Sequence, residues 1–194
     1  MKEMEKFVRL YREKKYEQCL VALRAFIAKY PNETSALGYA GLCYLDLERS
    51  SEAVPYFDRC LEEKAGSNHF WVLRGDCYYD QGDFAQAMHD YSISLALEPE
   101  NWAVYDKIGH CHHFLGQGER GIAWVEYAFE RGRQPDTMLI LSMLFEENGR
   151  LDEALARARA GAREFPHDKR FRERLQELKR IPRSREDSKR KPEK

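Results

Sequence analysis

Small residues recur along this chain at an almost constant spacing, between stretches in which apolar and polar positions follow a helical period. Cys19, Ala53, Ala87, Gly121 and Ala154 are separated by steps of 34, 34, 34 and 33 residues. Further series keep the same register: Gly41, Gly75, Gly109 and Ser142; Tyr44, Tyr78, His112 and Phe145; and, at double the step, Pro31, Pro99 and Pro166. Such self-similarity is typical of a solenoid, in which each unit buries its apolar face against its neighbours. It favours a binding surface over a catalytic pocket.

The clearest unit, residues 68–101, predicts two helices. The first covers about residues 70–81, and Gly82 ends it as a C-cap. Asp83 starts the second helix as an N-cap, and Pro99 stops it. The positions that carry this interpretation are Trp71, Gly75 and Tyr78 in the first helix and Phe84, Ala87, Tyr91 and Leu95 in the second. Gly75 and Ala87 are small, which indicates that the two helices approach closely there.

This unit resembles a tetratricopeptide repeat (TPR). The motif of that family has an early aromatic residue, Leu-Gly, a Tyr, then Gly-Asp-Tyr/Phe, Ala, Tyr/Phe, Ala and Pro. The corresponding residues here are Trp71, Arg74, Gly75, Tyr78, Gly82, Asp83, Phe84, Ala87, Tyr91, Ser94 and Pro99. The resemblance covers roughly residues 1–168. It implies an all-α fold, a right-handed TPR superhelical solenoid of antiparallel helix pairs.

The period divides the solenoid, residues 1–180, into five repeats and a cap. The repeats span about residues 1–33, 34–67, 68–101, 102–134 and 135–168. Residues 169–180 are expected to form an amphipathic capping helix, because a solenoid needs a polar outer face at its end. Residues 181–194 are basic and lack an apolar period, which predicts a disordered tail.

Two repeats depart from the pattern. Phe7 stands where the first repeat should have glycine, which predicts a weak first helix. Phe7, Leu10 and Tyr11 would then be available as the face of a homodimer. In the fourth repeat Gly121 replaces alanine, at a cost of about 1 kcal/mol in helix propensity. We therefore expect the fourth repeat to be the loosest interior unit.

Charge is unevenly distributed. The 194 residues include 32 Lys and Arg and 33 Asp and Glu, for a formal net charge of −1. Residues 179–194 hold eight basic and three acidic residues, which leaves 24 basic and 30 acidic residues in the body. An acidic body gives no reason to expect nucleic acid as a partner. No apolar run approaches the ~20 residues of a membrane span, and the N-terminus lacks the core of a secretory signal, so we expect a cytoplasmic protein.

The five cysteines fit that setting. Cys43, Cys77 and Cys111 occupy the same position in three successive repeats, two residues after the glycine series. Cys19 and Cys60 also stand at positions where other repeats have mostly small residues. We expect all five to be small buried apolar residues rather than a disulfide framework.

In TPR proteins the first helices of the repeats line a concave groove. The positions expected to be exposed there are Ser35, Gly38, Leu42, Leu45 and Asp46; His69, Val72, Asp76, Tyr79 and Asp80; Ala103, Asp106, His110, His113 and Phe114; and Asp136, Leu139, Met143, Glu146 and Glu147. They include seven acidic residues and neither Lys nor Arg. From them we expect the peptide-binding groove to consist of His69, Asp76, Tyr79, Asp80, Asp106, His110, His113, Phe114, Met143, Glu146 and Glu147.

This groove predicts which peptides bind. The carboxylate clamp of some TPR proteins, which grips acidic C-terminal tails, needs Lys, Asn and Arg at positions that here hold Asp76, Asp106 and His110. An acidic peptide would be repelled, whereas a basic or amphipathic segment has complementary charge. In the run 110–113 only two or three ligands could converge on a metal, and structural zinc needs four, so we expect no metal.

We predict a non-catalytic adaptor or scaffold that holds a basic or amphipathic peptide or helix. No phosphate loop, dinucleotide motif or nucleophile elbow is present, so we expect neither an enzyme nor a bound cofactor. One alternative is a dedicated client chaperone resembling the secretion chaperones, which usually have fewer repeats. Another is a structural oligomer that assembles through its end repeats.

Overall fold

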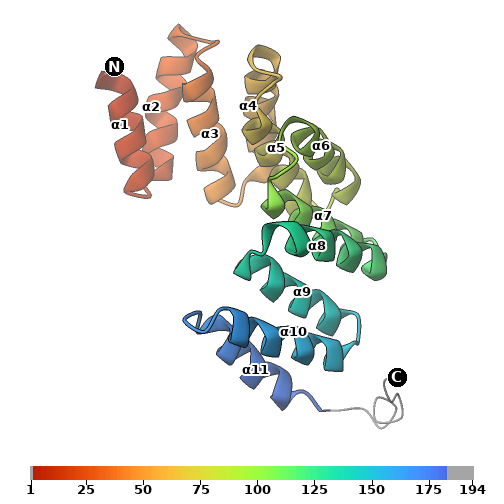
Figure 1. Cartoon of the computed structure of the whole chain (residues 1–194). Helices are drawn as coiled ribbons and strands as arrows, with labels where there is room; N and C mark the ends of the chain where they lie inside the picture. The colour runs from red at the N-terminus through yellow and green to blue at the C-terminus, as the bar shows by residue number, and fades with distance from the viewer. Residues whose placement is uncertain (1, 183–194) are drawn as a thin grey trace.

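A computed structural model describes residues 2–182 (Figure 1). This part of the chain is built from helices joined by short turns, and each helix packs antiparallel to the next. The helices are α1 (Lys2–Arg12), α2 (Tyr16–Lys29), α3 (Thr34–Asp46), α4 (Ser50–Glu63), α5 (Asn68–Asp80), α6 (Phe84–Leu97), α7 (Trp102–Phe114), α8 (Gly118–Gly132), α9 (Pro135–Glu147), α10 (Leu151–Glu164) and α11 (Arg170–Arg180). We call α1, α3, α5, α7 and α9 the A helices, and α2, α4, α6, α8 and α10 the B helices.

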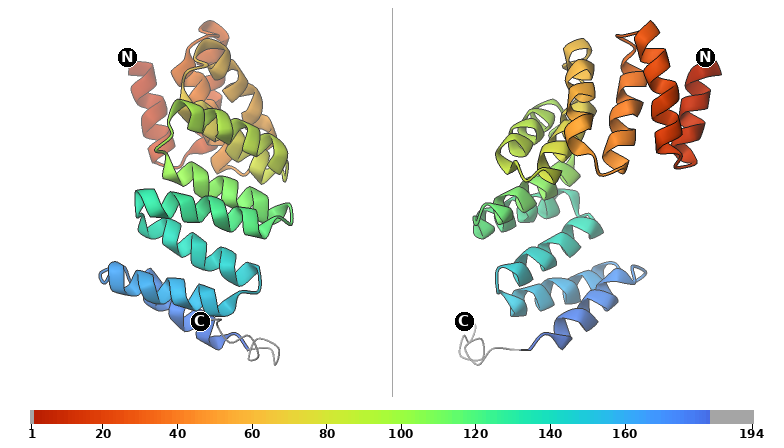
Figure 2. Two further views of the ribbon diagram at one scale, coloured as in Figure 1. Left: turned by 45° about the vertical axis from the view of Figure 1, so that its right-hand side comes forward. Right: turned by 180° about the vertical axis from the view of Figure 1, so that it is seen from behind.

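The helix pairs stack in a single file that bends into a right-handed superhelix. Helices α1–α4 stand upright in Figure 1, whereas α7–α11 lie across the view, and the two views of Figure 2 show the same change of direction. The first and last helices lie at opposite ends of the file. Each pair therefore shares its core with adjacent pairs only, as the repeat pattern predicted.

The unit α5–α6 shows how local chemistry sets the helix ends. Gly82 has a φ of +77°, the left-handed conformation that ends α5 at little steric cost. The Asp83 carboxylate accepts a hydrogen bond from the backbone N–H of Gln86 at 3.1 Å and caps α6. Both caps and the bounds of both helices agree with the sequence prediction to within two residues.

Glycine allows close contact inside the second and third helix pairs. A methyl group at Gly75 would lie 2.6 Å from a ring carbon of Tyr91, and one at Gly41 would lie 2.6 Å from the ring of Phe57. The small residue therefore makes room for a buried aromatic ring on the partner B helix. The predicted close approach at Gly75 is confirmed, and the Tyr91 ring is what fills the space.

The fourth repeat has a close contact at Gly121 that the expectation of a loose unit did not include. A methyl group at Gly121 would lie less than 3.0 Å from the backbone carbonyl oxygen of Gly109 on α7. The backbones of α7 and α8 therefore touch, whereas the second and third repeats place an aromatic ring against a glycine. Gly121 is needed for this contact, and its low helix propensity is offset by tighter packing.

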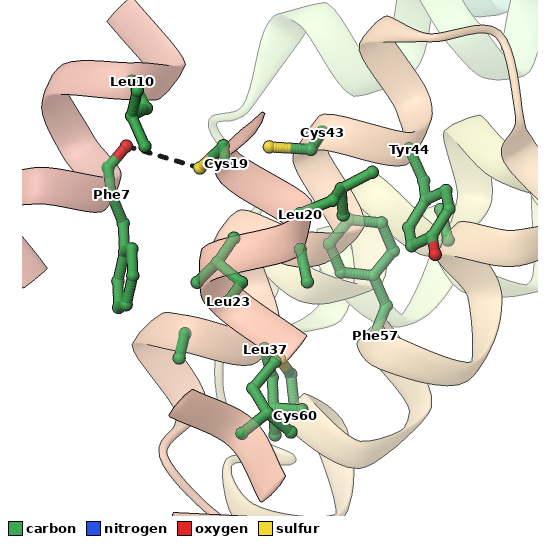
Figure 3. Packing of buried hydrophobic residues seen from close by; sticks show 14 of the residues in the cluster. Phe7, Leu10, Cys19, Leu20, Leu23, Leu37, Cys43, Tyr44, Phe57 and Cys60 are labelled. Carbon is green, nitrogen blue, oxygen red and sulfur yellow. Dashed lines mark hydrogen bonds between the residues drawn. The ribbon is translucent and has the colours of Figure 1, made fainter. Parts of the chain in front are cut away.

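The first repeat also differs from its prediction. α1 is a regular helix, Phe7 is only 3% exposed and Leu10 is buried. The Phe7 ring meets Phe26 of α2 edge-on at 5.3 Å, and Tyr11 packs against Tyr39 of α3 at 5.6 Å. Phe7 and Leu10 belong to the N-terminal core and are not available as a dimer face (Figure 3), and Tyr11 is partly buried against that core.

The cysteine prediction is confirmed, because all five are buried and free. The Cys19 thiol points to the backbone carbonyl oxygen of Phe7 at 3.5 Å, and Cys43 lies beside it (Figure 3). Burial raises the pKa of the thiols, to about 12 for Cys60, Cys77 and Cys111. They are protonated at neutral pH and act as small apolar residues.

The C-terminal end is closed by α11, where Phe171 and Leu178 are buried against α10 and its neighbours. This is the capping position that the amphipathic pattern predicted. Most of the predicted basic tail, residues 183–194, lies outside the described residues. None of the helices within residues 2–182 combines the length and the apolar character needed to cross a membrane.

Candidate functional site

The predicted groove residues all come from α5, α7 and α9, but their environments differ. His69, Asp80, Phe114, Met143 and Glu147 are exposed on the A helices. Asp76, Tyr79, His110, His113 and Glu146 are partly buried. Asp106 is buried. We call the side formed by the exposed and partly buried residues of α3, α5, α7 and α9 the A-helix face.

Asp76 links two repeats. Its Oδ1 accepts a hydrogen bond from the Tyr91 hydroxyl at 2.7 Å and pairs with the Lys107 ammonium at 2.8 Å. The sequence placed no basic residue on this face, yet Lys107 reaches from α7 to α5 across the repeat boundary. The charge of Asp76 is thereby already compensated within the chain.

Asp106 was expected to be exposed in the groove, and the structure shows that it is buried. Its carboxylate is 6% exposed and lies in the boundary between α7 and α9, where Oδ2 accepts a hydrogen bond from the Thr137 hydroxyl at 2.9 Å. The other oxygen, Oδ1, has no hydrogen-bond partner among the described residues. Burial raises the pKa of Asp106 to about 7. A buried carboxyl of this kind cannot contact a peptide on the surface, so Asp106 is a packing residue.

The acids at both ends of α9 are paired with the cap. Glu146 pairs with Arg174 of α11, and Asp136 pairs with Arg170 at 2.5 Å. The sequence analysis expected both acids to be exposed on this side and counted Glu146, but not Asp136, in the peptide-binding groove. Their arginine partners belong to the capping helix, whose side chains the repeat register did not place.

The two histidines lie on one side of α7, as predicted. Burial lowers the pKa of His110, so its imidazole is neutral at neutral pH. His113 lies 3.4 Å from a carboxylate oxygen of Glu147 on α9. Among residues 2–182 no group of three or more His, Cys, Asp or Glu side chains is arranged to hold a metal ion.

An aromatic cluster lies at the end of the A helices, beside the A–B turns. The ring of Phe114 stacks on Phe84 with centroids 5.0 Å apart and an interplanar angle of 8°. Tyr79 meets both rings edge-on, at 5.5 Å from Phe84 and 5.9 Å from Phe114. We call this cluster, with the exposed carboxylates of Asp80 and Glu147 at the ends of α5 and α9, the aromatic lip.

Sequence reasoning found part of this lip and missed part. Tyr79, Asp80, Phe114 and Glu147 were predicted from the A-helix register. Phe84 was read as a motif residue that follows the N-cap of α6. The sequence signal that could have placed Phe84 in the lip is the aromatic residue at the end of the next A helix, Phe114.

A second aromatic surface lies between α7 and α8 and was missed. Tyr105, Ala123, Trp124 and Tyr127 line a shallow pocket there. Tyr105 and Tyr127 stack with centroids 5.4 Å apart, and the Arg131 guanidinium lies 4.2 Å from the centre of the Tyr127 ring. The exposed ring of Tyr127 lies one turn along α8 from Trp124, a spacing visible in the sequence.

Comparison with known proteins now decides the family. Two family models, each described as tetratricopeptide repeat, match residues 6–68 and residues 69–101. The chain is a TPR protein. These matches join directly at residue 69, and the remaining helix pairs continue the same architecture towards α11.

Solved TPR structures share this fold at low sequence identity. The chain resembles a thermophilic TPR protein of Thermus thermophilus with a TM-score of 0.73, at 18% identity over 93% of this chain and 98% of that one. MamA is similar with a TM-score of 0.72, at 14% identity over 94% and 96%. YrrB, a TPR protein with an unusual peptide-binding site, has a TM-score of 0.58, at 16% identity over 81% of each chain.

Curated relatives match only over part of their length. The Hsp70-Hsp90 organizing protein of Triticum aestivum is 21% identical over 119 residues, 61% of this chain and 20% of that protein. The N-terminal acetyltransferase A complex auxiliary subunit NAA15 of Arabidopsis thaliana is 25% identical over 97 residues, 50% of this chain and 11% of that protein. The chain thus spans a fifth or less of the length of these relatives.

Proposed function

We propose that this TPR protein is a non-catalytic adaptor or scaffold that holds a basic or amphipathic segment of a partner protein on its A-helix face. The observation that carries the proposal is the combination of surface apolar side chains and carboxylates on consecutive A helices. Phe114 is 55% exposed and Met143 is 40% exposed. Asp80 and Glu147 lie on the same face and are also exposed.

The comparisons support an adaptor in general terms. TPR proteins bind protein partners, and one relative is by its name an organizing protein for two chaperones. The expected clamp positions hold Asp76, Asp106 and His110 in place of Lys, Asn and Arg, so we do not expect an acidic tail as the ligand of this chain. A cytoplasmic setting belongs to the same proposal, because five buried free thiols suit a reducing environment.

The structure changes which residues the proposal depends on. Asp76 and Glu146 are paired with basic residues of the chain and Asp106 is buried, so on α5, α7 and α9 the proposal depends on Asp80 and Glu147 for its negative charge. Self-assembly through Phe7 and Leu10 loses its basis, since both lie in the core. The adaptor function is the one that the remaining surface favours.

Site-specific photocrosslinking tests this proposal. The photoreactive amino acid p-benzoylphenylalanine would replace His69 or Met143 on the A-helix face, with Glu62 and Ala123 on B helices as matched exposed controls. We expect the two A-helix positions to crosslink to one specific set of proteins in cell extract. Crosslinks formed only from the B-helix positions would refute the proposed face.

A further inference from the structure

The aromatic lip is the part of the A-helix face where exposed apolar surface and available negative charge coincide. Phe114 is the last residue of α7, and more than half of it is exposed although its ring stacks on Phe84. Leu115 follows it and is 42% exposed. The stack holds the Phe114 ring in a defined position, so little side-chain freedom remains to be lost when a ligand packs on it.

The carboxylates of the lip differ from the other acids of α5, α7 and α9 in their partners. Asp80 accepts a hydrogen bond from the hydroxyl of Ser50 at 2.8 Å. Within the described part of the chain, the ion-pair partner of Glu147 is the His113 imidazole, at 3.4 Å. Within residues 2–182 neither acid is paired with Lys or Arg, whereas Asp76, Asp136 and Glu146 each have such a partner.

We propose that the aromatic lip binds an arginine side chain that stands next to a large apolar residue in the partner segment. This inference rests on the proposed function and specifies its chemistry. A guanidinium stacks on an aromatic face and donates to carboxylates in the same plane, so one arginine can use Phe114 and one of the acids of the lip together. The neighbouring apolar residue covers the exposed parts of Phe114 and Leu115. Asp80 and Glu147 attract the cation from the ends of α5 and α9.

A displayed library of random 12-residue peptides, selected on the full chain, tests the inference. We expect the enriched peptides to contain Arg, or Lys more weakly, beside Leu, Ile, Met or an aromatic residue. The enriched peptides would be labelled with fluorescein, and their affinity measured by fluorescence anisotropy. Replacing the arginine by citrulline, its neutral isostere, should weaken binding at least fivefold at low salt, and the loss should shrink at high salt.

Variants of the protein locate the contact. Asp80→Asn combined with Glu147→Gln should weaken the same peptides at least fivefold, and Phe114→Ala should weaken them by a similar factor. Glu62→Gln combined with Glu130→Gln is the matched control, because it removes two exposed acids of the B helices. Its affinity should be unchanged. Circular dichroism would confirm that each variant keeps its helix content.

Amide chemical shifts distinguish failure of this inference from failure of the proposed function. Peptide-induced shifts at residues 79–84 and 113–115 support the lip. Shifts elsewhere on the A helices, with full affinity retained by the Asp80→Asn/Glu147→Gln variant, would overturn the proposed arginine site at the lip. The proposal that the A-helix face binds the partner would then still stand. Peptides that shift only α6, α8 or α10, or a library that yields no binder, would overturn both proposals.

Discussion

Replacing Gly121 by alanine tests the close contact between α7 and α8. Alanine is the better helix former by about 1 kcal/mol, so propensity alone predicts a more stable protein. The new methyl group would, however, lie less than 3.0 Å from the carbonyl oxygen of Gly109 and 3.4 Å from the backbone nitrogen of His113. Both contacts are with backbone atoms of a packed helix, which cannot rotate away as a side chain can.

The net effect follows from comparing these terms. Forcing an extra methyl group into a packed contact typically costs about 1–3 kcal/mol, and rigid backbone neighbours place this site at the upper end. After the gain in propensity we expect a loss of about 1–2 kcal/mol in the free energy of unfolding. For a chain of this size that lowers the melting temperature by roughly 2–8 °C.

Urea and thermal unfolding followed by circular dichroism measure this loss. Gly66→Ala is the control, because a methyl group there meets no atom within 4 Å and the residue lies outside the left-handed region. Its stability should change by less than about 0.5 kcal/mol. A Gly121→Ala protein more stable than the wild type would refute the close-contact explanation and restore the original expectation of a loose fourth repeat.

Three further outcomes are expected. The pKa of Asp106 is raised to about 7, so the folded state keeps a proton that the unfolded chain releases near pH 4, and stability should fall as pH rises from about 5 to 8. Asp106→Asn should flatten that dependence in urea titrations at pH 5 and pH 8. Arg74 donates two hydrogen bonds to the carboxylate of Asp90, which is 0% exposed, so Arg74→Met should cost about 3–5 kcal/mol by leaving that charge buried and unpaired. Calorimetry should show part of the loss recovered when Asp90→Leu is added. Phe171→Ala should cost about 3–5 kcal/mol in the same assay, with hydrogen exchange rising first in α11, because this fully buried ring packs the capping helix against α10.

The sequence predicted local structure well because local structure depends on neighbours in the chain. Gly82 and Asp83 specify a helix end and a helix start through their own backbone and side-chain chemistry. The cysteines and Gly75 occupy positions whose burial follows from the period alone. The helix pairs, their order and the cap could therefore be predicted from the sequence.

The environment of the candidate site was less predictable, since it depends on residues one repeat away. The register correctly placed Asp106 on an A helix, but it could not show that Thr137 covers it from α9. It likewise could not show that Lys107 neutralises Asp76. A periodic pattern tells which side of a helix a residue occupies. The residue that faces it across a repeat boundary decides whether its side chain is exposed and unpaired, and so able to bind a partner protein.

The polar links between repeats have a mechanical consequence. Asp76–Lys107, Asp106–Thr137 and Glu126–Arg157 each join residues 31 apart in sequence, so each spans a single repeat boundary. A change in the angle between two repeats therefore affects distant repeats only through the repeats between them. The end repeats have one neighbour each, so we expect them to be more mobile than the middle of the solenoid. A partner that contacts α5, α7 and α9 together would restrain the relative movement of three repeats across two boundaries. Its binding should stiffen the middle of the molecule while the end repeats continue to fray.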